Sequence, residues 1–197
     1  NVTTLTYSEV EGIEPAGDPL ASIPTPTATG CVAGISLTGN ITKTISPGCY
    51  NGISATGNIT LNLNPGTYVI NGGLNFTGNV NINGTGVTLA LLGSSTGLTG
   101  NVALNLSAPT SGAYKGILID QPSSNTNPIS LTGNAGSTLE GVVYAPGANV
   151  TFTGNSGSNV YADFVVKSLT LTGNAGFNDY AALPGNSSPF TTATLVE

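Results

Sequence analysis

The tripeptide Thr-Gly-Asn occurs seven times in this chain of 197 residues, and its spacing limits the fold more than any other feature. Successive copies begin 18, 21, 22, 33, 21 and 19 residues apart. The first and last residues of the seven copies are Thr38 and Asn40, Thr56 and Asn58, Thr77 and Asn79, Thr99 and Asn101, Thr132 and Asn134, Thr153 and Asn155, and Thr172 and Asn174. A period near twenty residues is too short for a helix pair or a propeller blade, and it fits one turn of a stacked β-coil.

Apolar and polar residues alternate around each copy, as at Ile35 and Leu37 before the first one. Such alternation is typical of a strand with one buried face. The central Gly indicates a bend between two strands, because it adopts backbone angles that strain other residues. Further turns are indicated by Pro-Gly at residues 65–66 and Asn-Gly at residues 71–72. The sequence therefore predicts an all-β, single-domain parallel β-helix (β-solenoid) of about six to seven rungs, with three short strands in each rung.

The repeat covers residues 30–180, which we expect to form the β-helix. Residues 1–29 lack it and hold four of the twelve prolines, so they predict an extended N-terminal arm or linker. Residues 181–197 also lack it, and we expect them to form a C-terminal cap or return segment. The 33-residue step contains residues 107–128, which predict an insertion that loops out of the coil. Loops on a rigid scaffold commonly carry binding residues.

Charged residues make up only 6% of the chain, against roughly 25% in an average soluble protein. The formal net charge is −6, and the only basic side chains are Lys43, Lys115 and Lys167. Nucleic acid is therefore not an expected partner, since there is no basic face to bind it. The longest wholly apolar run, residues 89–92, is far shorter than the ~20 residues that span a bilayer, so no membrane span is expected in this chain.

Two cysteines, Cys31 and Cys49, flank the first predicted rung. An even number of cysteines without any His favours a disulfide in an oxidising compartment over a zinc site. Two free buried thiols are the alternative. A disulfide that closes this loop without strain would stabilise the first rung by ~3 kcal/mol.

Several short segments extend in a specific order through nearly the whole chain. They are residues 18–24 (DPLASIP), Cys31, and residues 47–50 (PGCY), 63–74 (LNPGTYVINGGL), 84–88 (GTGVT), 108–112 (APTSG), 116–118 (GIL) and 195–197 (LVE). In this order they resemble the C-terminal region of TadG-like proteins, which belong to the tight-adherence (Flp) pilus-assembly group of bacteria. The resemblance implies the exported portion of a protein with a role in pilus biogenesis, adhesion and biofilm formation. It implies no catalytic residues.

These observations predict a non-enzymatic structural or adhesive module of a bacterial surface appendage, located outside the cell, at its surface or facing the periplasm. The expected partners are pilus or cell-surface proteins, glycans, or further copies of the chain. Exposed ends of a solenoid offer unpaired strand edges, so a homo-oligomer or filament is one form that this module would take. No cofactor is expected.

Polysaccharide cleavage, which is common among parallel β-helices, needs a carboxylate pair or a strong base with calcium on one face of the coil. Aligning residues 116–118, 141–143 and 164–166 places Lys115, Glu140 and Asp163 in one charged column. We interpret this column as a solvated surface ladder, because no Arg or His is present to support catalysis. A glycan or cation site is the alternative. Asp120 lies near a predicted loop and matches no calcium motif, so no metal is expected either.

The Thr column suggests one further alternative, an ice-binding solenoid with a regular hydroxyl array. Thr at a strand end is also favoured by β-propensity and by hydroxyl ladders, while Asn side chains bond to one another between rungs. The residues two positions before and after Thr38 are Ser36 and Asn40, so the first rung has no second Thr column beside it. This favours a structural ladder over an ice-binding face.

Overall fold

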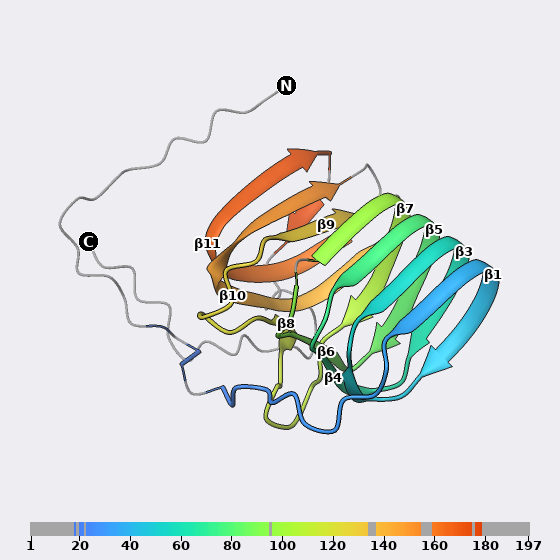
Figure 1. Ribbon diagram of the computed structural model, residues 1–197. Helices are drawn as coiled ribbons and strands as arrows, with labels where there is room; N and C mark the ends of the chain where they lie inside the picture. The colour runs from blue at the N-terminus through green and yellow to red at the C-terminus, as the bar shows by residue number, and fades with distance from the viewer. Residues whose placement is uncertain are drawn as a thin grey trace.

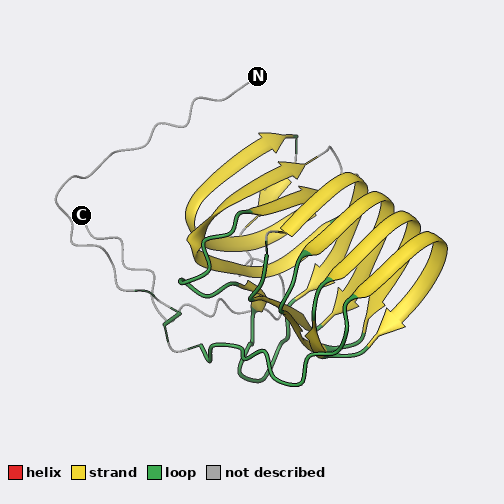
Figure 2. Cartoon of the chain, viewed as in Figure 1, coloured by secondary structure: helices red, strands yellow, loops and turns green. Residues whose placement is uncertain are grey.

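The computed structural model describes residues 18, 20–21, 23–94, 96–133, 137–154, 159–174 and 176–178. These residues form twelve strands and no helix, coiled into a parallel β-solenoid of about six turns (Figures 1 and 2). The predicted fold class is therefore confirmed. Of the predicted boundaries, the C-terminal segment 181–197 and most of residues 1–29 lie outside the described residues.

Long and short strands alternate along the chain. The strands are β1 (Ile35–Ile45), β2 (Gly48–Tyr50), β3 (Ile53–Leu63), β4 (Gly66–Ile70), β5 (Leu74–Thr85), β6 (Val87–Leu91), β7 (Thr96–Ser107), β8 (Ile117–Asp120), β9 (Ile129–Gly133), β10 (Thr138–Gly154), β11 (Asn159–Gly173) and β12 (Gly176–Asn178). The long strands β1, β3, β5 and β7 pair in register, and so do the short strands β2, β4 and β6. In the later rungs one strand occupies both places. β10 pairs with the short strand β8 and, further along, with β9, which continues the long strands, and β11 follows β10 along its length.

Each of the first four rungs contains one long strand and one short strand, instead of three short strands. The two strands predicted on either side of Thr-Gly-Asn are continuous, because the rung-to-rung ladder runs through the bend. In β3, for example, pairing with β1 extends from Ile53 to Leu63 across Gly57. The glycine turns the chain while its neighbours keep their partners in the adjacent rungs.

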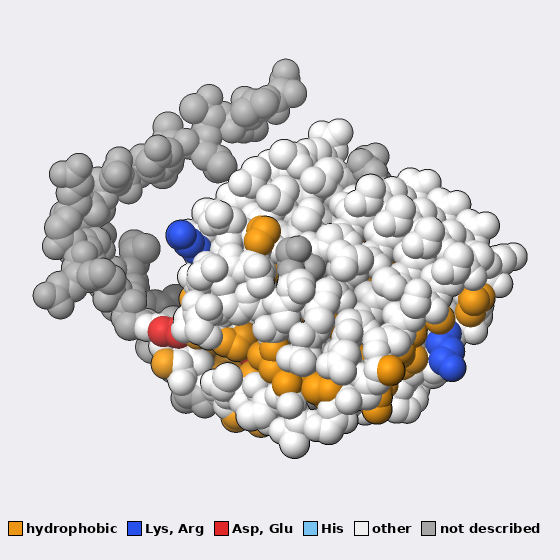
Figure 3. Space-filling view, viewed as in Figure 1, with side chains coloured by type: hydrophobic (Ala, Val, Ile, Leu, Met, Phe, Trp, Pro, Cys, Tyr) orange, Lys and Arg blue, Asp and Glu red, His pale blue; other side chains and the backbone are white. Residues whose placement is uncertain are grey.

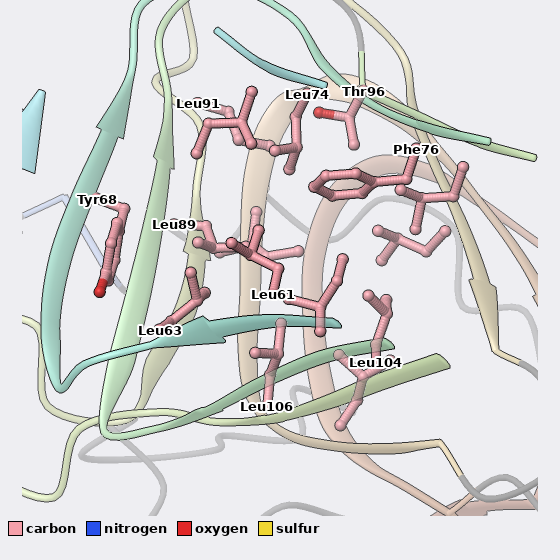
Figure 4. A pocket seen from close by; sticks show the side chains of 16 residues that line it. Leu61, Leu63, Tyr68, Leu74, Phe76, Leu89, Leu91, Thr96, Leu104 and Leu106 are labelled. Carbon is pink, nitrogen blue, oxygen red and sulfur yellow. The ribbon is translucent and has the colours of Figure 1, made fainter. Parts of the chain in front are cut away.

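The core lies inside the coil and consists of columns of apolar side chains. One column contains Leu37, Ala55, Phe76 and Leu98, all buried. Figure 4 shows such side chains meeting in the interior, around a cavity of about 30 Å³. The surface of this cavity is wholly apolar, and an apolar cavity of this kind stays dry. The interior is a packed core and not a ligand chamber.

A buried tyrosine hydroxyl closes one corner of this core. The Tyr68 hydroxyl lies 2.9 Å from the Ile45 carbonyl oxygen and 2.8 Å from that of Asn64. Burial and the neighbouring Tyr50 raise the pKa of Tyr68 to about 12, although the hydrogen bond with Asn64 opposes the shift. The hydroxyl therefore stays neutral and has a structural role.

Cys31 and Cys49 form the predicted disulfide, with their Cα atoms 4.3 Å apart. The bond joins β2 to the segment that enters the coil. Backbone hydrogen bonds support the same contact, since the Val32 N–H donates to the Cys49 carbonyl at 2.9 Å. The first rung of the described coil is thus held covalently.

The predicted insertion at residues 107–128 is two loops and not one. They span residues 108–116 and 121–128, and the fully buried strand β8 lies between them. β8 stays in the coil because its apolar side chains continue the short-strand columns, with Ile119 paired to Leu89. Only the two flanking loops leave the rung pattern.

The described part of the N-terminal arm carries no strand between residues 18 and 29. It does not stand free, because Leu20 is buried against Ile117, Val142 and Tyr144 on the outside of the short-strand face. The Tyr114 hydroxyl also donates to the Pro24 carbonyl at 2.9 Å. Figure 1 shows this segment, in blue, running along the side of the coil toward β1. We refer to residues 18–26 as the N-terminal segment.

Candidate functional site

The Thr-Gly-Asn copies form two polar columns on the outside of the coil. Thr38, Thr56, Thr77 and Thr99 pair in register, and so do Asn40, Asn58, Asn79 and Asn101. The Asn79 Nδ2 donates to Asn58 Oδ1 at 2.9 Å, and Asn101 Nδ2 donates to Asn79 Oδ1 at 3.0 Å. Amide ladders of this kind let each side chain bond to its copy in the next rung. The Asn column is therefore an ordered surface.

The last rungs continue the Thr column. Thr132 pairs with Thr153, which pairs with Thr172, and the hydroxyls of Thr153 and Thr172 lie 2.9 Å apart. The Thr132 hydroxyl donates to the Leu98 carbonyl at 3.2 Å. Asn134 and Asn155 lie outside the described residues, whereas the backbone N–H of Asn174 donates to the Gly154 carbonyl at 2.8 Å. The hydroxyls of these rungs thus bond to one another or to the backbone.

A groove of about 400 Å³ follows the Asn column across the first three rungs. Its polar lining is Asn40, Asn58, Asn79, Thr42, Thr60 and Asn81. These side chains carry hydrogen-bond donors and acceptors and no charge, so they suit hydroxyl-rich ligands and offer no group for proton transfer. We call this the amide groove. Figure 3 shows few Lys, Arg, Asp or Glu side chains on the face in view.

The predicted charged column is not formed as expected. Val142 pairs with Ile117 as predicted, but it also pairs with Asp163, while Glu140 pairs with Tyr161. Asp163 therefore lies two residues along the strand from Glu140, and Lys115 lies exposed in the turn before β8.

Crowding around Gly141 explains this register. A Cβ atom at Gly141 would lie 2.7 Å from the Ala108 Cβ and 2.8 Å from the Leu118 Cβ. The small Ala162 pairs with this crowded position, and the larger Phe164 pairs with Val143, where it packs against the core. The predicted alignment placed Phe164 on Gly141 and so shifted Asp163 by two residues.

A second polar site lies where the N-terminal segment crosses the coil. It is a cleft of about 310 Å³ between this segment, β10 and the loop after β8. Its polar lining side chains are Asp18, Thr25, Asp120, Ser123, Ser124 and Tyr144. No lysine is among its described lining residues. We call it the acidic cleft.

The two carboxylates of the acidic cleft differ in their surroundings. Asp18 is well bonded, since the Tyr144 hydroxyl donates to its Oδ2 and the Leu20 N–H donates to its Oδ1 at 2.9 Å. Asp120 ends β8 and is only 3% exposed. Its Oδ2 is buried and has no hydrogen-bond partner among the described residues.

Burial raises the pKa of Asp120 to about 6. Burial also raises the pKa of Tyr144 above its usual range, with further contributions from the Asp18 hydrogen bond and from the charges of Asp18 and Asp120. The pKa of Tyr114 is raised as well, by burial and by the charge of Asp120. Above about pH 6 the cleft therefore holds negative charge that none of its described lining side chains neutralises.

Sequence reasoning missed this cleft. The available signal was an Asp that directly follows the apolar residues 117–119, because the end of a buried strand is a common place for a functional carboxylate. Nothing in the sequence indicated that Asp18 lies across the coil near it. Their place in one cleft depends on Leu20, which anchors the N-terminal segment to the short-strand face.

Comparison of the chain with protein-family models, with curated proteins and with solved structures finds no match. Among the described residues, no group of three or more His, Cys, Asp or Glu side chains is placed to hold a metal ion. The part of the chain that the structure describes also contains no helix long and apolar enough to cross a membrane.

Proposed function

We propose that the protein is a non-enzymatic structural and adhesive module that works outside the cytoplasm, in a bacterial surface appendage or a pilus-assembly system. The observation that carries this proposal is the amide groove on a coil whose rungs are in register. Asn58, Asn79 and Asn101 are joined by hydrogen bonds from rung to rung, so this part of the column is ordered before any contact is made. Preorganised groups lose little conformational entropy on binding.

The location outside the cytoplasm is supported by the disulfide between Cys31 and Cys49, since such bonds persist in oxidising compartments. The assignment to a pilus or adhesion system is supported by the resemblance of segments such as residues 63–74 to TadG-like proteins. Because charged side chains are scarce, we expect the protein to contact its partners mainly through hydrogen bonds. Salt weakens such contacts less than it weakens ion pairs.

A glycan is the ligand class that the amide groove favours among the alternatives. Amide and hydroxyl groups repeat along it at about 4.8 Å, the spacing of paired strands. A sugar chain presents hydroxyl groups that both donate and accept, as these side chains do. The ice-binding alternative has less support, because the Thr column is flanked on one side by Asn and on the other by Ser36, Ser54, Asn75 and Gly97.

The proposal is tested by attaching the protein to beads and measuring their adhesion to bacterial cells and to immobilised polysaccharides. Asn79→Ala removes a side chain from the groove, and we expect adhesion to fall about fivefold, the effect of roughly one hydrogen bond. Asn83→Ala is the matched control, since Asn83 belongs to a parallel ladder with Asn62 and Asn105 and does not line the groove.

Equal adhesion of wild type and Asn79→Ala, with both folded, would contradict a role for the groove. Adhesion to cells but not to polysaccharides would favour a protein partner over a glycan. Thermal hysteresis in a solution of the wild-type protein would instead favour the ice-binding alternative.

A further inference from the structure

We propose that the acidic cleft is a binding site for a divalent cation of the calcium type, with the carboxylates of Asp18 and Asp120 as its charged ligands. This site is separate from the amide groove and goes beyond the proposed adhesive function. It rests on a buried carboxylate without a partner, on a second carboxylate held in place in the same cleft, and on the oxygen-rich lining of that cleft.

The side chain of Asp120 is the first observation. A buried carboxylate costs free energy unless hydrogen bonds or an opposite charge compensate it. Its Oδ2 has no hydrogen-bond partner among the described residues, although the residue is only 3% exposed. An apolar residue of similar size would avoid this cost at the end of β8. A bound cation would supply the missing charge.

Asp18 is the second observation. The Leu20 N–H and the Tyr144 hydroxyl each donate to one of its oxygens, which fixes the direction of the carboxylate. Each oxygen of an ionised carboxylate accepts two hydrogen bonds or ligand contacts, so both keep a lone pair after these bonds. Asp18 is therefore oriented and still able to coordinate an ion.

The lining of the cleft selects the class of ion. Its polar side chains carry only oxygen, from carboxylates, hydroxyls and the Tyr144 phenol, and none carries nitrogen or sulfur. Oxygen ligands suit hard cations such as Ca²⁺ and Mg²⁺. Ca²⁺ accepts six to eight oxygens in irregular geometry, and a cleft of about 310 Å³ leaves room for several waters in its shell. Two carboxylates balance the charge of one divalent ion.

The two ligands come from parts of the chain that are far apart in sequence. Asp18 belongs to the N-terminal segment, and Asp120 ends a strand inside the coil. An ion between them would join the segment to the coil beside the Leu20 contact. We expect a dissociation constant of about 10⁻⁴ to 10⁻³ M, the range of calcium sites in extracellular modules. The attachment of the N-terminal segment would then depend on calcium in the surroundings.

Terbium luminescence tests the site on the full chain. Tb³⁺ takes the oxygen ligands that Ca²⁺ takes, and a nearby tyrosine such as Tyr144 sensitises its emission. We expect saturable tyrosine-sensitised emission that Ca²⁺ displaces. Asp18→Asn and Asp120→Asn should each weaken Tb³⁺ and Ca²⁺ binding at least about tenfold, because affinity follows the charge of the ligands. Glu140→Gln is the matched control, since Glu140 does not line the cleft, and it should bind as wild type does.

A thermal-melting experiment separates loss of binding from loss of folding. Above pH 6 and without Ca²⁺, Asp120→Asn should melt at a higher temperature than wild type, because it removes the uncompensated buried charge. Ca²⁺ should raise the melting temperature of wild type by more than it raises that of Asp120→Asn.

The pH dependence gives a further check. The other titratable groups that line the cleft or are affected by the charge of Asp120 are Asp18, Tyr114 and Tyr144. Both tyrosines have raised pKa values and stay neutral near pH 6. Because a carboxylate must be ionised to bind Ca²⁺, binding should weaken as acid protonates Asp18 and Asp120. Absence of saturable emission, or equal binding by wild type and both cleft variants, would overturn the proposal. Equal weakening by Glu140→Gln would overturn it too, as that result would indicate a diffuse charge effect.

Discussion

The glycine at the centre of each Thr-Gly-Asn meets two separate demands. Gly78 has a φ of +106°, which residues with a Cβ adopt only with strain. Its position also faces the preceding rung, where an added Cβ would lie 2.8 Å from the Gly57 carbonyl oxygen. Gly100 repeats this geometry, with its Cβ position 2.9 Å from the Gly78 carbonyl oxygen. The bend and the close stacking of rungs thus require the same residue.

Two variants distinguish the requirement for a positive φ from the requirement for close stacking. Gly78→Ala should lower the free energy of unfolding by at least about 2 kcal/mol, since it adds a backbone collision to the strain at positive φ. Gly112→Ala should cost about 1 kcal/mol, because Gly112 has a φ of +85° but nothing within 4 Å of its Cβ position. Urea denaturation of both variants measures the difference. Equal costs would show that stacking adds nothing to the requirement for glycine.

At the scale of elements, the N-terminal segment belongs to the packing of the coil. Leu20 covers Ile117, Val142 and Tyr144, which point away from the interior on the outside of β8 and β10. Without the segment these apolar side chains would face water. The described part of the predicted arm thus docks on its own chain.

The strength of this docking is measurable at Leu20. Leu20→Ala should lower the free energy of unfolding by about 2 to 4 kcal/mol, the cost of truncating a buried leucine. Thr27→Ala, at an exposed position of the same stretch, should change it by less than about 0.5 kcal/mol. Thermal and urea melts report both values. If Leu20→Ala melts as wild type does, the segment contributes little to the stability of the coil.

At the scale of the whole molecule, the two ends of the solenoid differ. The first rung places Lys43 in the inward column that continues as Leu61, Ile82 and Leu104. An inward-facing charge on an edge strand opposes the addition of another strand. In the last described rungs, the inward positions are Leu169 and Leu171, which are 37% and 48% exposed.

This asymmetry bears on the expectation of filaments. Stacking a second copy on the first rung would bury the Lys43 ammonium, so wild type should not add copies at this end. Lys43→Leu completes the apolar column and should cause concentration-dependent self-association, visible by sedimentation velocity and electron microscopy. Lys115→Leu is the control, because Lys115 is exposed in a turn away from this end. Filaments of wild type that are unaffected by Lys43→Leu would contradict this role for the lysine.

The sequence by itself determined the features that repeat. The rung period, the inward columns such as Leu37 and Phe76, the glycine bends and the bond between Cys31 and Cys49 were all predicted and are present. This was possible because each residue of a solenoid packs against its own copy one rung away. A contact between rungs therefore appears in the sequence as a repeat of residue types.

Only the tertiary structure decided the features that do not repeat. The path of residues 18–26 across the coil, the burial of β8 within the insertion and the register that separates Asp163 from Glu140 have no copy elsewhere in the chain. The acidic cleft depends on the first two of these, since Asp18 and Asp120 line one cleft only when both segments are in place. Such contacts depend on the fit of unlike side chains from distant parts of the chain. A local sequence pattern therefore does not predict them.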